Sequence, residues 1–254
     1  MKVALIQTSL IWENPAANRS RFSNLIHTLD SETDLIVLPE MFTSGFTMNP
    51  EHIPYEEAGY TLDWMRENAT RTGAALAGSF IFQEGVAYFN RLVFMFPDGR
   101  YEYYDKRHTF TLAGEDKVYQ RGNQRKTVRY KGLTFSLQIC YDLRFPVWSR
   151  NTNDYDVLIY VANWPRTRIA AWDTLLKARA IENMSYVLGV NRIGEDMNGL
   201  KYEGHSAIYD ALGERLAFSQ REEILYATLD KNNMEEIRTT LRFLQDRDSF
   251  TLES

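Results

Sequence analysis

Two short apolar runs restrict the fold of this chain most strongly. The first is Asp-Leu-Ile-Val-Leu-Pro-Glu at 34–40, and the second is Asp-Val-Leu-Ile-Tyr-Val-Ala-Asn at 156–163. Unbroken apolar runs of this length are typical of strands buried on both faces. Amphipathic segments at helical spacing alternate with such runs, and they predict helices over 16–29, 57–70 and 172–184. This alternation predicts a layered α/β fold.

Turn signals between the runs indicate that the sheets are mixed. Pro97-Asp98-Gly99 separates the predicted strands 88–96 and 101–106, which favours a hairpin. Two such sheets packed face to face would make a four-layer αββα sandwich. The 254 residues, 44% of them hydrophobic, are enough for one core. We therefore expect a single domain over 1–254, whose C-terminal part from about 231 forms a helix and then a frayed or partner-contacting tail. Other strands are predicted over 3–8, 74–82, 132–139, 185–191, 207–209 and 224–229.

Composition excludes several classes of protein. A single cysteine rules out an intrachain disulfide framework, and the four histidines show no zinc-site spacing. We therefore expect a reducing, cytoplasmic location and neither metal nor cofactor. The N-terminus lacks the apolar core of a signal peptide, and no stretch approaches a membrane span. A net charge of −5 without a basic stripe argues against nucleic acid, and we interpret the locally basic segment 121–131 as a solvated hairpin.

Four chemically active residues fall where predicted strands end. They are Glu40, Lys106, Cys140 and Asn163. Ligands of open α/β sheets bind at the carboxyl ends of strands, so this coincidence suggests a site. Each residue also has an ordinary interpretation. Glu40 can be a solvated strand end, Lys106 an exposed lysine, and Cys140 a small buried hydrophobic residue.

These residue types together suit nucleophilic catalysis by a thiol. A cysteine with a pKa near ~8.5 needs a base or a cation to become a thiolate. Glu40 could accept the proton, although histidine is the usual partner, and Lys106 could stabilise the charge. The Lys106 ammonium and the backbone N–H of Tyr141 could then hold an oxyanion when the thiolate adds to a carbonyl.

Three sequence blocks resemble the nitrilase, or carbon–nitrogen hydrolase, superfamily. They are Leu-Pro-Glu at 38–40, Tyr-Asp-Lys-Arg-His at 104–108 and Ile-Cys-Tyr-Asp-Leu-Arg-Phe-Pro at 139–146. Later blocks at 163–165, 178–183 and 204–206 are also similar, so the likeness covers nearly the whole chain. The resemblance implies an αββα sandwich, usually paired into dimers. It also implies a triad of Glu40 as general base, Lys106 as oxyanion stabiliser and Cys140 as nucleophile.

A second glutamate often lies between the lysine and cysteine blocks of this family. Here Gly114-Glu115-Asp116-Lys117 occupies that place, and Glu115 resembles the family's residue. Asp116 is the competing candidate, and a solvated loop acid is the ordinary alternative.

The branch of the family is suggested by the residues around the predicted pocket. Asn163-Trp164-Pro165 with Arg168, and Met41-Phe42-Thr43, resemble the omega-amidases, which hydrolyse 2-oxoglutaramate and 2-oxosuccinamate. A substrate carboxylate needs a bidentate donor, for which Arg168 is favoured over Arg166, although either can be a surface residue. Phe42, Trp164 and His205 could wall the pocket, or they could be core and structural residues.

The sequence thus predicts hydrolysis of a terminal carboxamide to acid and ammonia through a cysteine thioester, with a small amide as substrate and a homodimer or higher homo-oligomer as assembly. Alternatives are a nitrilase, an N-carbamoyl amidohydrolase, or a non-catalytic binding protein with the same sandwich. A redox-sensing thiol protein is disfavoured because the chain has no resolving cysteine.

Overall fold

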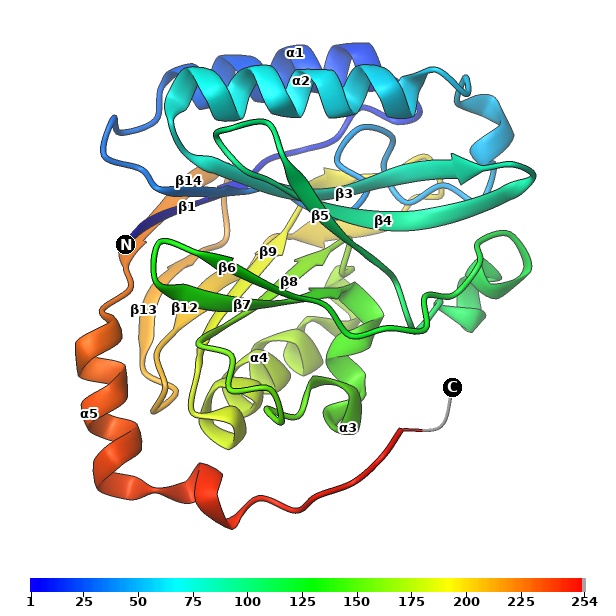
Figure 1. Cartoon of the computed structure of the whole chain (residues 1–254). Helices are drawn as coiled ribbons and strands as arrows, with labels where there is room; N and C mark the ends of the chain where they lie inside the picture. Colours follow the sequence, from blue (N-terminus) through cyan, green and yellow to red (C-terminus); the bar gives the residue numbers. More distant parts are fainter. Residues whose placement is uncertain (253–254) are drawn as a thin grey trace.

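Two six-stranded sheets pack face to face in the computed structural model, which describes residues 1–252 (Figure 1). The first sheet has the order β14-β1-β2-β3-β4-β5 and the second has the order β13-β12-β9-β8-β7-β6. The strands of the first sheet are β1 (Lys2–Gln7), β2 (Leu35–Val37), β3 (Ala75–Glu84), β4 (Ala87–Met95), β5 (Tyr101–Asp105) and β14 (Glu223–Thr228). Those of the second are β6 (Thr127–Tyr130), β7 (Leu133–Ile139), β8 (Val157–Ala162), β9 (Tyr186–Asn191), β12 (Ser206–Tyr209) and β13 (Arg215–Ser219).

Both sheets are mixed, as the hairpin signals predict. Strands β1, β2 and β3 run parallel; β14 pairs antiparallel with β1, β4 pairs antiparallel with β3, and β5 pairs antiparallel with β4. Strands β7, β8 and β9 likewise run parallel; β6 pairs antiparallel with β7, β12 pairs antiparallel with β9, and β13 pairs antiparallel with β12. The carboxyl ends of β2 and of β7 and β8 therefore lie at one end of the sandwich, which is where ligands collect in such sheets.

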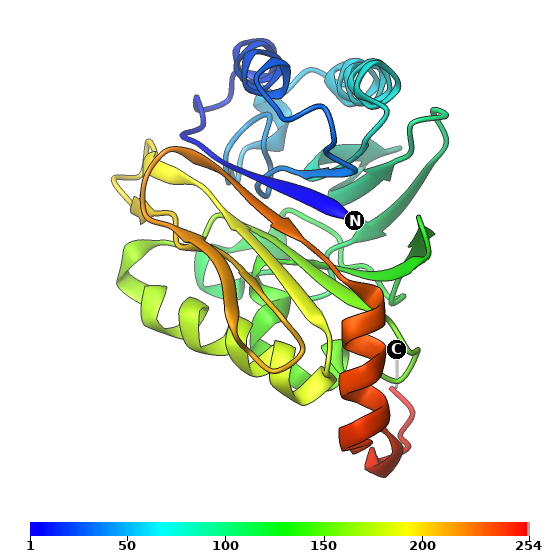
Figure 2. The same ribbon diagram turned by 90° about the vertical axis from the view of Figure 1, so that its left-hand side faces the viewer.

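Helices cover the outer face of each sheet and complete the four layers. Helices α1 (Pro15–His27) and α2 (Glu57–Thr72) lie on the first sheet, whereas α3 (Pro146–Ser149) and α4 (Ile169–Asn183) lie on the second (Figures 1 and 2). Helix α5 (Lys231–Leu241) follows β14 at one side of the sandwich. Asn14 caps α1 through its side chain, and left-handed Gly73 ends α2. Among residues 1–252, no helix is long and apolar enough to cross a membrane.

The largest apolar cluster joins the inner faces of the two sheets. Phe94 on β4 and Phe135 on β7 lie within it, with ring centroids 5.5 Å apart. A second cluster packs α1 and α2 onto the first sheet through Phe22 and Met65. Both faces of β2 are therefore buried, which explains the unbroken apolar run in the sequence.

The structure also contains short strands that the sequence analysis did not predict. They are β13 and the two-stranded hairpin of β10 (Ile193–Glu195) and β11 (Lys201–Glu203). Strands β10 and β11 have only three residues each, and β13 is Arg-Leu-Ala-Phe-Ser, so none of them is long enough to show the alternation that marks a strand. The predicted hairpin over 121–131 is wrong in extent, because this segment contributes only β6, whose partner is β7.

Candidate active site

Glu40, Lys106 and Cys140 meet at one end of the sandwich. Glu40 follows β2 and Lys106 follows β5 in the first sheet, whereas Cys140 follows β7 in the second. Lys106 Nζ lies 2.8 Å from Glu40 Oε1, and both side chains are fully buried. The tertiary structure therefore brings together three residues that the sequence places at separate strand ends.

Glu115 is a second buried carboxylate in this cluster. Its two carboxylate oxygens lie 3.0 and 2.9 Å from Lys106 Nζ, and the backbone N–H of Phe110 also donates to it. Neighbouring Asp116 is exposed. Of the two candidate acids, only Glu115 thus contacts the lysine.

Two asparagines hold the carboxylate of Glu40. Asn90 Nδ2 donates to Glu40 Oε1 at 2.8 Å, and the backbone N–H of Asn163 donates to Oε2 at 2.8 Å. Asn163 Nδ2 also donates to the Glu40 backbone carbonyl at 2.6 Å, which ties the end of β8 to the end of β2. Sequence reasoning missed Asn90, although a polar residue inside the apolar run of β4 was a signal for it.

Burial and the two carboxylates shape the charges of the cluster. Burial opposes the charge of Lys106, but Glu115 and Glu40 outweigh it and raise the lysine pKa, so the ammonium persists. Burial, only partly offset by Lys106, raises the pKa of Glu115. Burial and the adjacent Glu40 raise the pKa of the Cys140 thiol well above its usual range. The resting cysteine is therefore a neutral thiol beside a base.

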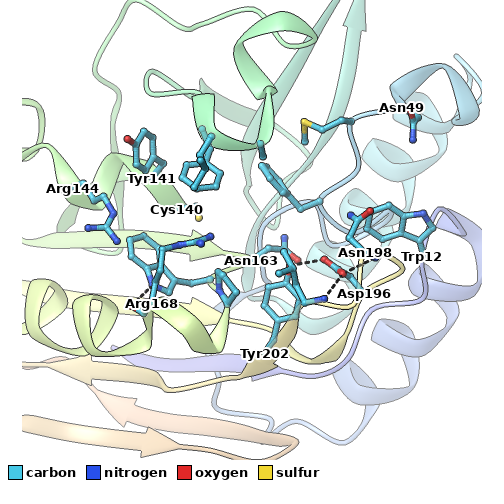
Figure 3. Close-up of a pocket in the computed structure, with 18 residues that line it drawn as sticks. Trp12, Asn49, Cys140, Tyr141, Arg144, Asn163, Arg168, Asp196, Asn198 and Tyr202 are labelled. Atoms are coloured by element: carbon cyan, nitrogen blue, oxygen red, sulfur yellow. Dashed lines mark hydrogen bonds between the residues drawn. The ribbon is translucent and has the colours of Figure 1, made fainter.

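Cys140 lies on a sharp turn between β7 and the short 3₁₀ helix Cys140–Arg144. Its φ is +44°, in the left-handed region that few non-glycine residues adopt. The first N–H groups of a helix have no partner within the helix, so the N–H of Tyr141 is available next to the sulfur. The Cys140 side chain lies at the wall of a cavity of about 440 Å³ (Figure 3).

The cavity lining contains some of the predicted pocket residues and several others. Trp164 and Arg168, two of the predicted substrate-binding residues, line it, and so does Tyr141, which was predicted only to contribute its backbone N–H. Arg144 and Phe110 also line it and were not predicted. The loop around Leu112 and the β10–β11 hairpin, with Asp196 and Tyr202, form further walls (Figure 3).

Three residues predicted to bind substrate, Phe42, His205 and Arg166, lie outside the cavity lining, and Phe42 lies in the core. Met41 has a φ of +44° and turns the chain after Glu40, so that Phe42 packs between the first sheet and its helices, against Phe22 and Phe80. The prediction that Phe42 walls the pocket is therefore wrong, and its core alternative is correct.

His205 and Arg166 also lie outside the cavity lining. His205 Nδ1 is 2.9 Å from Asp173, and its ring packs edge-to-face on Phe218 at 5.0 Å. Arg166 is exposed and lies 3.6 Å from Glu203. His205 is thus a hydrogen-bonded structural residue, and Arg166 is a surface residue.

Comparison with known proteins identifies the family. The family model for carbon–nitrogen hydrolases matches residues 2–239. The chain therefore belongs to the carbon–nitrogen hydrolase family, whose members are enzymes.

Relatives within this family include amidases. "Omega-amidase YafV" of Yersinia enterocolitica is 44% identical over 254 residues, covering 99% of this chain and 98% of the relative. A "2-oxoglutaramate amidase" of Bacillus subtilis is 30% identical over 250 residues, covering 96% of each protein. A carbon–nitrogen hydrolase superfamily protein of Xanthomonas campestris, crystallised with an arsenic adduct in its active site, is 40% identical with a TM-score of 0.97. That match covers 100% of this chain and 99% of the other.

Proposed function

We propose that this protein is an omega-amidase that hydrolyses the terminal carboxamide of a 2-oxo dicarboxylic acid monoamide, such as 2-oxoglutaramate or 2-oxosuccinamate. The relatives named omega-amidase and 2-oxoglutaramate amidase support this substrate class. The triad geometry supports amide hydrolysis through a thioester, with Cys140 as nucleophile, Glu40 as base and Lys106 as oxyanion stabiliser.

Two arginines that line the cavity favour a substrate with a carboxylate group. The Arg168 guanidinium lies over the Phe110 ring at 4.9 Å, and that of Arg144 lies over the Trp164 ring at 4.9 Å. Within residues 1–252, neither guanidinium has a carboxylate within ion-pair distance. Two unneutralised cations that are held on aromatic walls favour a substrate carboxylate, which arginine binds through paired hydrogen bonds.

The proposed reaction proceeds by four proton transfers, each to or from the carboxylate of Glu40. Glu40 takes the Cys140 proton as sulfur adds to the amide carbon, and Lys106 with the Tyr141 N–H stabilises the oxyanion. Protonated Glu40 then gives its proton to the amide nitrogen, and the C–N bond breaks. Ammonia departs, and the acyl group remains bound to Cys140 as a thioester. Water attacks the thioester and transfers a proton to Glu40. Collapse breaks the C–S bond, releases the acid and returns the proton to sulfur.

Glu115 acts behind Lys106 in this scheme. Its carboxylate contacts the ammonium through both oxygens and holds it in place. Burial, offset in part by the Lys106 charge, raises the pKa of Glu115.

The first experiment measures ammonia release from 2-oxoglutaramate, 2-oxosuccinamate, glutamine, asparagine, an aliphatic nitrile and an N-carbamoyl amino acid. We expect turnover of the two 2-oxo acid amides, and its loss in Cys140→Ala with an unchanged circular dichroism spectrum. Retained turnover in Cys140→Ala would refute the nucleophile. Turnover of only the nitrile or the carbamoyl compound would refute the substrate class.

A second experiment tests the arginines with a matched control. Charge-assisted hydrogen bonds contribute about 1.5–3 kcal/mol, so Arg168→Met and Arg144→Met should each raise KM for 2-oxoglutaramate about 10- to 100-fold. Methionine retains much of the apolar stem, which limits packing losses. Arg166→Met, two residues from Arg168 but outside the cavity lining, should leave KM unchanged. An unchanged KM in both cavity variants would contradict carboxylate binding by these arginines.

We also infer a cytoplasmic homodimer. A single free cysteine is typical of proteins from a reducing compartment, which supports the location. Apolar side chains exposed on the tail, Phe243 and Phe250, support a contact with a second copy of the chain.

A further inference from the structure

Asp142 is a fully buried carboxylate two residues beyond Cys140, and it contacts neither the cavity nor the triad lysine. Its two oxygens accept four hydrogen bonds. Oδ2 accepts from the Ile139 N–H at 2.9 Å and from the Tyr104 hydroxyl at 2.8 Å. Oδ1 accepts from the His108 N–H at 3.0 Å and from His108 Nδ1 at 2.7 Å. This saturation makes Asp142 a fixed point of the local structure.

The four donors flank two catalytic residues on different sheets. Ile139 directly precedes Cys140 at the end of β7. Tyr104 and His108 lie two residues before and two residues after Lys106. One carboxylate therefore joins the turn that carries the thiol to the segment that carries the ammonium.

The bond to Ile139 also supports a strained residue. Cys140 has a φ of +44°, a conformation that costs roughly 1–3 kcal/mol for a non-glycine residue and persists only where the surroundings enforce it. The Asp142 carboxylate closes a ring around Cys140, from the residue before it to the residue two after it. This bond therefore helps to hold Cys140 in the left-handed conformation.

Two of the residues that donate to Asp142, Tyr104 and His108, have further contacts with aromatic side chains. Trp148 Nε1 donates to the Tyr104 hydroxyl at 3.0 Å, and the His108 ring stacks on Phe145 at 3.6 Å with an interplanar angle of 5°. Burial and the Asp142 charge raise the pKa of Tyr104 well above its usual range, so its hydroxyl remains a donor. The network is thus rigid on both sides of the carboxylate.

We propose that Asp142 is a positioning residue for the hydrolysis: through Ile139, Tyr104 and His108 it holds the Cys140 thiol in line with Glu40 and Lys106. This inference rests on the proposed roles of Cys140, Glu40 and Lys106 in the amidase reaction. It assigns no contact between Asp142 and the substrate. Its effect is therefore on kcat and on thiol reactivity, not on substrate binding.

The test compares three variants that loosen the network to different degrees. In Asp142→Asn an amide NH₂ replaces one carboxylate oxygen. This NH₂ then faces two hydrogen-bond donors, either Ile139 N–H with the Tyr104 hydroxyl or the two N–H groups of His108, and cannot accept from them. Tyr104→Phe and His108→Phe each remove one donor, and in His108→Phe the phenyl ring keeps the stack on Phe145. A displacement of about 1 Å can cost roughly 100-fold in rate, so Asp142→Asn should lower kcat for 2-oxoglutaramate by about that factor, with KM changed less than about threefold. The two phenylalanine variants should lower kcat about fivefold.

Alkylation of Cys140 gives a readout that a purely stabilising role would not change. Cys140 is the only cysteine, so the rate of its reaction with iodoacetamide between pH 6 and 10 reports on this thiol alone. When Glu40 is aligned, it assists proton removal and keeps the thiol reactive at neutral pH. In Asp142→Asn we expect the neutral-pH rate to fall at least about tenfold and to rise with pH like that of an unassisted thiol.

Asp156→Asn is the matched control. Asp156 is a buried aspartate that accepts from the Thr134 N–H at 2.9 Å and from Arg238 at 3.0 Å, near the start of β7, far along the strand from Cys140. This variant should lower the melting temperature and leave kcat and the alkylation profile unchanged.

The possible outcomes distinguish a failure of the proposed role of Asp142 from a failure of the proposed amidase function. If Asp142→Asn is less stable but has the kinetics and alkylation profile of Asp156→Asn, Asp142 is merely structural and the proposal fails. If Asp142→Asn does not fold, wild-type kcat and alkylation in both Tyr104→Phe and His108→Phe overturn the proposal, whereas reduced values support it. If the wild-type protein turns over no 2-oxo acid amide, the substrate assignment fails while the alkylation profiles still decide the role of Asp142.

Discussion

The reactive cluster has more acids than cations, and this imbalance determines how the thiol can react. Glu40, Glu115 and Cys140 surround one ammonium, that of Lys106, in a fully buried space. A thiolate would add a further negative charge there, which explains why burial and Glu40 raise the cysteine pKa. In the proposed reaction, proton transfer from the Cys140 thiol to Glu40 therefore accompanies attack on the substrate.

At the residue scale, we predict different roles for the two glutamates. Glu40→Gln should lower kcat by about 10²- to 10⁴-fold and also slow neutral-pH alkylation of Cys140, because loss of the base outweighs the lower thiol pKa that removal of its charge brings. Glu115→Gln should lower kcat through misplacement of Lys106. It should retain alkylation, since removal of the Glu115 charge lowers the thiol pKa. Steady-state ammonia release and iodoacetamide kinetics measure both effects. Loss of alkylation in Glu115→Gln with retained alkylation in Glu40→Gln would identify Glu115 as the proton acceptor, and equal loss in both would contradict the separate roles.

At the element scale, the fit of α4 on the second sheet supports the turn at Cys140. Arg179 on α4 donates to the Leu143 carbonyl at 2.6 Å, in the 3₁₀ helix that begins with the cysteine. Gly189 on β9 allows α4 this close approach, because a Cβ there would lie 2.4 Å from Leu176 Cδ1. Helix α4 thus contacts both Gly189 on β9 and the turn that begins at Cys140.

Gly189→Ala should consequently destabilise the protein by about 1–3 kcal/mol through overpacking. Gly59→Ala is the matched control, since Gly59 lies in α2 and a Cβ there would meet nothing within 4 Å. Alanine in a helix should stabilise the protein by about 0.5–1 kcal/mol. Urea unfolding curves provide both values. A Gly189→Ala protein as stable as the wild type would show that α4 can move outward at no cost.

At the scale of the whole molecule, the tail beyond α5 lies near the short helix α3. Val147 on α3 and Phe250 on the tail border the same groove, and both are exposed, by 53% and 38%. Phe243 at the start of the tail is 59% exposed. A surface of this kind on one side of the sandwich is suited to a second copy of the chain.

We predict that light scattering gives twice the chain mass of 29.6 kDa for the full chain. Truncation after Arg242 should shift the mass toward that of a single chain, because it removes Phe243 and Phe250. Val86→Ser alters an equally apolar side chain that is 96% exposed at the β3–β4 turn, and it should leave the mass unchanged. A single-chain mass for the untruncated protein would refute the dimer.

The sequence by itself determined the layers and the ends of the central strands. Apolar runs report burial on both faces, and a residue that breaks such a run marks the strand end, so Glu40, Lys106 and Cys140 could be placed before the structure was known. Their spacing along the chain, with the family resemblance, was sufficient to predict the sandwich and the triad.

The tertiary structure alone decided which side chains share a cavity. Phe42 follows a strand end but turns into the core, whereas Arg144 turns into the cavity beside Arg168. Asn90 contacts Glu40 across 50 residues of sequence, and Asp142 contacts Tyr104 across 38 residues. The spacing of apolar residues indicates which faces of a helix or strand are buried. It carries no information about which residues of another sheet lie opposite, because that depends on the twist, register and packing of both sheets.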